Sequence, residues 1–140
     1  VRNIFDCVVS LLDFYNRGAF SNSFFRGDYS SLDEETRIDL LIDNLVPWYF
    51  QFVASWSLVE KQRRTDLMWL SYEDMIDDKP KTISEVLGFY GLGAPRRGIE
   101  RRIKEIESKK RRTRFNKGVA GRGASRLSYE QKDRIKSYAR

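Results

Sequence analysis

Residues 67–75, Leu-Met-Trp-Leu-Ser-Tyr-Glu-Asp-Met, decide the fold that this sequence predicts. The first four residues form a short, continuous apolar run, which favours a strand buried on both faces, as in a parallel sheet covered by helices. The acidic neighbours Glu73 and Asp74 suit the first turn of a helix, where the helix dipole favours negative charge. A buried strand that leads directly into a helix is typical of α/β proteins.

The rest of the sequence predicts mainly helices. Apolar side chains at helical spacing indicate one helix over residues 5–15, and Ser31 and Glu34 have the spacing of a capping box that opens another. Pro47 suits the first turn of a third helix, antiparallel to the second. Residues 16–30, which are rich in Gly, Ser and Asn, are predicted to form a loop. Further helices are predicted after Pro80 with a stop at Gly91, after Pro95 and after Ser128.

Val1 and Arg2 are expected to end a second strand, so that two strand-to-helix junctions lie in one chain. The length of 140 residues and the hydrophobic fraction of 41% suit one domain with its own core. We therefore predict a single α/β domain over residues 1–140, predominantly helical with one or two short parallel strands. Ligands of open α/β sheets bind beyond the carboxyl ends of the strands, where Arg2 and Tyr72 are expected.

The composition excludes several kinds of chemistry. The sequence contains no histidine, so His-dependent catalytic triads and the commonest general base are absent. Its single cysteine, Cys7, allows no intrachain disulfide and no Cys-rich zinc site, and it is compatible with a reducing compartment such as the cytoplasm. No apolar run approaches the roughly 18 residues that a membrane-spanning helix needs.

The net charge of +6 conceals an asymmetry along the chain. Residues 1–95 carry 9 Lys and Arg against 15 Asp and Glu, a net charge of −6. Residues 96–140 carry 17 against 5, a net charge of +12. An anionic partner is therefore expected at the C-terminal third, although a solvated, arginine-rich helix face would explain the same charges.

Arg2 and Ser10 are the first pair of candidate binding residues. An arginine at the end of a strand and a hydroxyl two helical turns onward can converge on one anion. The guanidinium offers a planar fork of donors that suits phosphate oxygens, and the hydroxyl adds a neutral donor. Spacing alone leaves a second interpretation open, in which Arg2 pairs with Asp6 and Ser10 lies on the helix surface.

Residues 114–122, Arg-Phe-Asn-Lys-Gly-Val-Ala-Gly-Arg, form the second candidate. Glycines let backbone N–H groups approach an anion closely, and Lys117 supplies a point charge. The segment is not a Walker A loop, because G-x-x-x-x-G-K-[ST] occurs nowhere in the chain, and a flexible basic loop is the alternative. The third candidate is Tyr72, whose ring can either contact a nucleotide base or belong to the core.

In this order, the three segments resemble the C-terminal half of the sulfotransferase domain that uses 3′-phosphoadenosine-5′-phosphosulfate (PAPS). Residues 1–10 are similar to the family's R-[ND]-P-x-D-x-x-x-S segment, in which Arg2 and Ser10 would bind the 3′-phosphate. Tyr72 matches the tyrosine of the family's strand-plus-YEDL segment, which reaches the adenine. Residues 115–121 resemble the F-x-[RK]-K-G-x-x-G loop, which closes over the same phosphate. The residues that match this loop are Lys117, Gly118 and Gly121.

The sequence departs from the family pattern at several positions. Ile4 stands where the family has proline. Asn116 stands where the family has an arginine, and Arg114 lies close enough in the sequence to replace the charged contact of that arginine. Arg122 and Gly123 stand in place of an acidic residue and a tryptophan. The cofactor site that the resemblance implies consists of Arg2, Ser10, Tyr72, Arg114, Asn116, Lys117 and Gly118.

By resemblance, the intact enzyme transfers the sulfuryl group of PAPS in line to a hydroxyl or amine acceptor, without a metal. The strand-loop-helix that binds the phosphosulfate, its catalytic lysine and the histidine base are expected upstream of Val1. We therefore expect a truncated domain of the P-loop-like, three-layer sulfotransferase fold. It would bind the 3′-phosphate and adenine end of PAPS, or of the product adenosine 3′,5′-bisphosphate, and would be inactive alone.

Two other functions are weighed against this one. A small helical module could bind nucleic acid through residues 96–140, with Phe115 and Tyr129 available for stacking. It ranks second, because it does not account for Arg2 or for the strand that leads into Tyr72. A P-loop kinase relative would share the fold, but the chain has no Walker motif.

Two further expectations concern partners. A parallel sheet without its first strands would expose an unpaired edge, so we expect chains to associate with one another through it. The acceptor substrate has no legible signature in residues 16–30 or 91–98, the loops that are candidates for its pocket.

Overall fold

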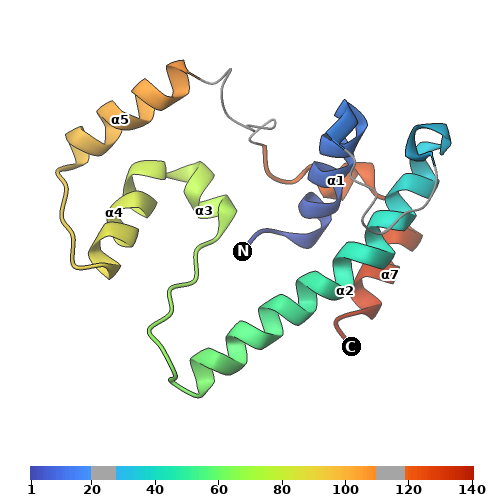
Figure 1. Cartoon of the computed structure of the whole chain (residues 1–140), viewed down its shortest axis with the longest axis horizontal. Coiled ribbons are helices and arrows are strands. Elements are labelled where there is room, and N and C mark those ends of the chain that lie inside the picture. The colour runs from blue at the N-terminus through green and yellow to red at the C-terminus, as the bar shows by residue number, and fades with distance from the viewer. Residues whose placement is uncertain (20–27, 110–118) are drawn as a thin grey trace. The chain divides into compact units, whose positions relative to one another are not determined.

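The computed structural model describes residues 1–19, 28–109 and 119–140, and within these ranges it contains helices and no strand (Figure 1). Most of the helices are α-helices; the exceptions are one π-helical and one 3₁₀ turn, labelled η1 and η2. In chain order the elements are α1 (Ile4–Phe14), η1 (Tyr15–Ala19), η2 (Tyr29–Ser31), α2 (Glu34–Lys61), α3 (Tyr72–Asp77), α4 (Lys79–Phe89), α5 (Arg96–Ser108), α6 (Arg122–Arg126) and α7 (Tyr129–Ser137).

The elements group into two compact units. The first unit comprises Val1–Arg2 and Asp66–Ala120, and it contains α3, α4 and α5. The second unit comprises Asn3–Thr65 and Gly121–Arg140, and it contains α1, α2, α6 and α7. The prediction of one domain over residues 1–140 stays a prediction.

The second unit has an apolar core at which α1 packs against α2 and α6, and α2 against α7. The apolar face predicted for the first helix is confirmed, because Val8, Val9 and Leu12 are fully buried. Each buried side chain of this size stabilises the fold by about 1.5–3 kcal/mol. The other buried residues of this core are Ile38, Leu41, Ile42, Val46, Leu127 and Ile135.

The predicted break at Pro47 is wrong, because α2 runs through this residue as one helix of 28 residues. A proline inside a helix removes one backbone hydrogen bond and crowds the preceding turn, at a cost of roughly 3 kcal/mol. Val46 is fully buried in the core, and Phe50, one turn further on, packs against the same core. These contacts on both sides of the proline hold the two halves in one helix.

The start of α2 also differs from the prediction, because its N-cap is Asp33 rather than Ser31. The Asp33 carboxylate accepts hydrogen bonds from the Thr36 backbone N–H and hydroxyl, both at 2.8 Å. Ser31 instead ends the 3₁₀ turn η2 and donates its hydroxyl to the carbonyl of Asp28. The predicted cap at Ser128 is confirmed, since its side chain opens α7 in a capping box with Gln131.

The loop predicted over residues 16–30 is wrong at both of its described ends. Residues 15–19 continue α1 as the π-helical turn η1, and Tyr29 and Ser30 belong to η2. Asp28 caps this second turn, accepting the Ser30 backbone N–H at 2.9 Å, and Tyr29 is buried. Local capping and burial therefore order residues whose composition alone favours a loop. The middle of the predicted loop lies outside the described residues.

The first unit consists of three helices packed in sequence, α3 against α4 and α4 against α5. Pro80 lies in the first turn of α4, and Gly91 follows the helix with a positive φ of 68°, as predicted for its stop. Pro95 precedes α5 directly, which confirms the predicted start of that helix. Ile99 of α5 is buried, whereas Ile106 is 60% exposed.

The predicted strands are wrong as regular elements, although the two segments do pair. The Val1 amino group donates to the Leu70 carbonyl, and the Tyr72 N–H donates to the Val1 carbonyl at 2.7 Å. This alternation is the hydrogen-bond pattern of parallel neighbours. Residues 67–70 are half-buried rather than buried on both faces. Within the described ranges, these two hydrogen bonds do not extend into a longer ladder, so the residues do not form a strand. Self-association through a sheet edge stays a prediction.

Candidate functional site

Arg2 is the residue at which the candidate binding segments meet. Its guanidinium lies over the Tyr72 ring, with Cζ 4.2 Å from the ring centroid. Its Nη2 also donates to the carbonyl of Val119, at a long distance of 3.4 Å. The side chains of Arg2 and Tyr72 are half-buried. The structure therefore joins Arg2 to two of the segments predicted to bind one anionic nucleotide.

The position of Tyr72 follows from its backbone. Ser71 caps α3 by accepting the Asp74 N–H at 2.9 Å, so that Tyr72 is the first residue of the helix. The hydrogen bond from the Tyr72 N–H to Val1 fixes the same residue beside the start of the chain. Because Arg2 follows Val1 directly, the pairing brings the guanidinium to the ring. Glu73 and Asp74 lie in the first turn, as predicted from the helix dipole.

Ser10, the hydroxyl predicted to act with Arg2, lies on α1 and is half-buried. This helix belongs to the second unit and is capped by Asn3, whose side chain accepts the Phe5 N–H at 3.0 Å. Arg2 belongs to the first unit, so the convergence of Arg2 and Ser10 on one anion stays a prediction. The other predicted cofactor residues lie outside the described residues; they are Arg114, Asn116, Lys117 and Gly118.

Asp6 is a functional candidate that the prediction missed. It is 2% exposed, and its two carboxylate oxygens accept the backbone N–H groups of Gly121 and Gly123, each at 2.6 Å. These bonds differ from the alternative interpretation, in which Asp6 pairs with Arg2. A signal was present in the sequence, because the helical spacing of Asp6, Val9 and Asp13 places two acidic residues beside an apolar stripe.

A second buried carboxylate, Asp13, holds the short helix α6 to α1. Arg122 donates to Asp13, and Arg126 donates to the same carboxylate at 2.9 Å. Arg126 also binds Glu34 of α2 at 3.0 Å. The Glu34 carboxylate is the main cause that raises the pKa of Arg126 above its ordinary value, and Asp13 adds to it. Arg122, which departs from the family pattern, therefore pairs within the second unit.

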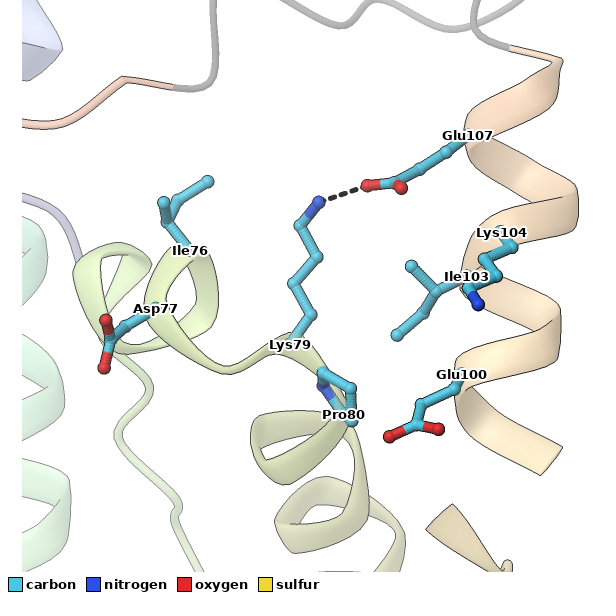
Figure 2. A pocket seen from close by; sticks show the side chains of 8 residues that line it. All are labelled: Ile76, Asp77, Lys79, Pro80, Glu100, Ile103, Lys104 and Glu107. Atoms are coloured by element: carbon cyan, nitrogen blue, oxygen red, sulfur yellow. Dashed lines mark hydrogen bonds and ion pairs between the residues drawn. The ribbon is translucent and has the colours of Figure 1, made fainter. Parts of the chain in front are cut away.

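The first unit also holds a pocket of about 310 Å³ between the α3–α4 junction and α5 (Figure 2). Figure 2 shows Lys79 extended toward Glu107, to which it donates a hydrogen bond. This ion pair links α4 to α5 across the pocket. None of the three candidate segments contributes to its lining, which consists of Ile76, Asp77, Lys79, Pro80, Glu100, Ile103, Lys104 and Glu107.

No group of three or more His, Cys, Asp or Glu side chains is arranged to hold a metal ion in residues 1–19, 28–109 and 119–140. Within the same ranges, every helix is too short or too polar to cross a bilayer.

Comparison with known proteins identifies the family. A model of the sulfotransferase domain matches residues 1–139, and these include all three candidate segments. The chain therefore belongs to the sulfotransferase domain family, a family of transferases. Neither the curated proteins nor the solved structures that were compared with the chain give a match.

Proposed function

We propose that this chain binds the 3′-phosphate and adenine end of PAPS for sulfuryl transfer to a hydroxyl or amine acceptor. The observation that carries the proposal is the place of Arg2, which stacks on Tyr72 at 4.2 Å and donates to Val119. A guanidinium beside an aromatic ring offers both of the groups that such a ligand needs, a cation for phosphate and a platform for a base.

The contact between Arg2 and Tyr72 limits how an adenine can bind. Because the guanidinium covers one face of the Tyr72 ring, an adenine would use the opposite face or the phenolic hydroxyl. A guanidinium has a planar fork of five N–H groups and can serve several acceptors at once, phosphate oxygens among them. Ser10 would add its hydroxyl from α1. The remaining donors of the proposed site would come from Arg114, Asn116, Lys117 and the backbone of Gly118.

The transfer step requires groups beyond this site. In an in-line transfer the acceptor oxygen or nitrogen forms a bond to sulfur while the bond from sulfur to the bridging oxygen of PAPS breaks, and a base takes the acceptor's proton. The 140 residues contain no histidine, and no segment of them resembles the phosphosulfate-binding loop. We therefore propose that this chain alone holds the nucleotide without transferring the sulfuryl group.

Calorimetric titration with adenosine 3′,5′-bisphosphate and with 5′-AMP tests the proposal. We expect the bisphosphate to bind more tightly, because only this ligand carries the 3′-phosphate. Arg2→Ala should weaken bisphosphate binding at least about tenfold, the loss expected for a charge-assisted hydrogen bond. Lys117→Ala should act in the same direction. Arg101→Ala is the matched control, because it removes one positive charge at an exposed position of α5. This variant should leave the preference for the bisphosphate over 5′-AMP unchanged.

Nucleic-acid binding is the outcome that would replace this proposal. Equal affinity for both nucleotides, together with tight binding of single-stranded DNA that falls steeply with salt, would show a site for the phosphate backbone instead. The ion pairs on α5 do not favour this outcome. Arg96 binds Asp78 at 3.2 Å and Glu100 at 2.9 Å, and Arg102 binds Glu105 at 2.9 Å. These partners neutralise part of the charge that a nucleic acid would need.

A further inference from the structure

One face of α5 carries a row of cations. Arg97, Arg101 and Lys104 are exposed, and at about 100° per residue they lie within about 60° of one another around the helix. Along the axis, successive members are about 6 Å and about 4.5 Å apart, because each residue advances the helix by about 1.5 Å. These three residues are called the cationic row below. Lys104 also lines the pocket of Figure 2.

The carboxylates of α5 are engaged by cations outside the row. Each glutamate of this helix forms an ion pair with another lysine or arginine. The pairs are Glu100 with Arg96, Glu105 with Arg102 and Lys109, and Glu107 with Lys79. Within the part of the chain that the structure describes, no side chain of the cationic row forms an ion pair or a hydrogen bond. The charge of the row is therefore available to a partner.

The apolar side of α5 lies opposite the row. At the same spacing, Ile99, Ile103 and Ile106 lie on the other side of the helix. Ile99 is buried, and Ile103 lines the pocket together with Pro80 of α4, so this side packs within the first unit. A helix that binds a lipid surface inserts its apolar face into the bilayer. Because α5 uses that face for packing, the row does not suit a lipid surface.

Separate cations along one helix face suit a linear polyanion. A guanidinium binds a carboxylate or a sulfate through two parallel N–H bonds, and an ammonium adds a point charge. A compact anion meets one member of the row, whereas an extended polymer meets all three. Single-stranded nucleic acid is usually held by aromatic side chains on which its bases stack. The sequence of α5 contains no aromatic residue, so a nucleic acid fits it less well.

The proposed transfer adds a second requirement to the polymer. Its acceptor must carry a hydroxyl or an amine. An acidic polysaccharide has hydroxyls on its sugars besides the carboxylates or sulfates that the row attracts, whereas a stretch of Asp and Glu residues has no hydroxyl. The row and the contact between Arg2 and Tyr72 belong to the same unit. A polymer on the row is thus held by the unit that contains part of the proposed nucleotide site.

We propose that the cationic row docks an acidic polysaccharide, and that a polymer of this class is the acceptor of the sulfuryl transfer. This inference deepens the proposed function, and the acceptor role rests on it. In the transfer, a sugar hydroxyl forms the new bond to sulfur and the bond from sulfur to the bridging oxygen of PAPS breaks. The hydroxyl proton passes to a base beyond this chain, and the products are a sulfate ester and adenosine 3′,5′-bisphosphate.

The test is the binding of a fluorescently labelled oligogalacturonate, a linear polymer with a carboxylate on every sugar, to the 140-residue chain. Fluorescence anisotropy measures its affinity at low salt and at physiological salt. Joint replacement of the row, by Arg97→Ala, Arg101→Ala and Lys104→Ala, should lower the affinity at least about tenfold, because one cation near an anionic surface contributes about fivefold. Arg101→Ala alone should lower it about fivefold. Alanine suits these exposed helical positions, so both variants should fold.

The matched control removes the same charge from another exposed place. Lys61, Arg63 and Arg64 lie at the end of α2 and just beyond it, in the second unit, and are exposed. Their joint replacement by alanine should leave the affinity within about twofold of the unmodified chain, the scatter expected for independent sites. Circular dichroism compares the helix content of the two triple variants.

The outcomes separate this inference from the proposed function. Unchanged affinity in the row variant, or an equal loss in the control variant, would refute docking at the row. Single-stranded DNA of equal charge that binds the unmodified chain as tightly as the polysaccharide would replace this partner by a nucleic acid. The proposed function is decided separately, by the preference for the bisphosphate over 5′-AMP. Absence of that preference would refute the proposed function and the acceptor role together, even if the row binds the polymer.

Discussion

The two units of this protein differ in how many apolar side chains they bury and in the polar contacts that they hold. The second unit buries a continuous apolar core and, beside it, the carboxylates of Asp6 and Asp13. Among the described residues of the first unit, Ile99 is the single buried apolar side chain, whereas Tyr90 and Leu92 are well exposed. Yet the first unit holds the contact between Arg2 and Tyr72 on which the proposed function rests. Stability is concentrated in one unit, and the clearest ligand chemistry lies in the other.

Residues 2–10, which are similar to the first segment of the family pattern, belong partly to the first unit and partly to the second. Arg2 belongs to the first unit, whereas Asp6 and Ser10 belong to α1 of the second. The substitutions that follow compare the stability of the two units.

Deletion of core volume should give the largest difference between the units. Ile42 is fully buried, and Ile42→Ala should lower the free energy of unfolding by about 2–5 kcal/mol. Ile99→Ala should destabilise less, because Ile99 is the single buried apolar side chain among the described residues of the first unit, so fewer buried neighbours lose contacts. Urea unfolding followed by circular dichroism measures both. Equal losses would show that the first unit has a core of comparable strength.

Gly123→Ala should come next in size. The added Cβ would lie 2.4 Å from the Phe5 backbone carbon, which no side-chain rotation can relieve. We expect the free energy of unfolding to fall by about 1–3 kcal/mol, as for an overpacked site. Thermal melting of this variant beside the unmodified chain measures the loss. An unchanged melting temperature would mean that α6 can move away from α1 without penalty.

Gly98→Ala offers the opposite sign in the first unit. Gly98 lies within α5, and an added Cβ would meet the Pro95 ring at 3.6 Å, an ordinary van der Waals distance. Alanine should stabilise the helix by about 0.5–1 kcal/mol, because glycine loses more backbone entropy on folding. The rise should appear in the melting temperature. A fall would indicate that α5 needs the flexibility of glycine at this position.

The smallest effect concerns pH and the cap of α2. Two hydrogen bonds from Thr36 lower the pKa of the Asp33 carboxyl below its ordinary value. The bond from the Thr36 backbone N–H has the larger effect, and the bond from its hydroxyl comes second. A carboxyl with a lowered folded-state pKa stabilises the fold above its unfolded-state pKa of about 3.9, and this contribution is lost as the pH falls through the folded-state value. Asp33→Asn keeps a capping oxygen without the titration.

Asp33→Asn should therefore lose less stability between neutral pH and pH 3 than the unmodified chain. Thermal melts over this range measure the difference. Identical pH profiles would show that the Asp33 cap makes no charge-dependent contribution.

Local signals in the sequence predicted most of the helices. The apolar face of α1, the capping box at Ser128 and the helix starts near Pro80 and Pro95 depend on neighbouring residues, and the structure confirms them. Pro47 misled the prediction, because the core contacts that carry α2 through it come from segments distant in sequence.

The candidate site also depends on contacts between residues that are distant in sequence. Tyr72 and Arg2 were predicted as separate motifs, and the resemblance to the sulfotransferase domain gave them a common ligand. Their contact depends on the pairing of Val1 with Leu70 and Tyr72, which no spacing rule predicts. The hydrogen bonds of Asp6 were not predicted, because its partners are backbone N–H groups more than a hundred residues away.

This long separation has a consequence for biosynthesis. Translation at about 5–20 residues per second puts roughly 6–23 s between the synthesis of Asp6 and that of Gly121, which is 115 residues later. During that interval α1 leaves the ribosome with a carboxylate whose partners at Gly121 and Gly123 do not yet exist. The local helices form within microseconds, so the hydrogen bonds of Asp6 with Gly121 and Gly123 are among the last contacts that a nascent chain completes.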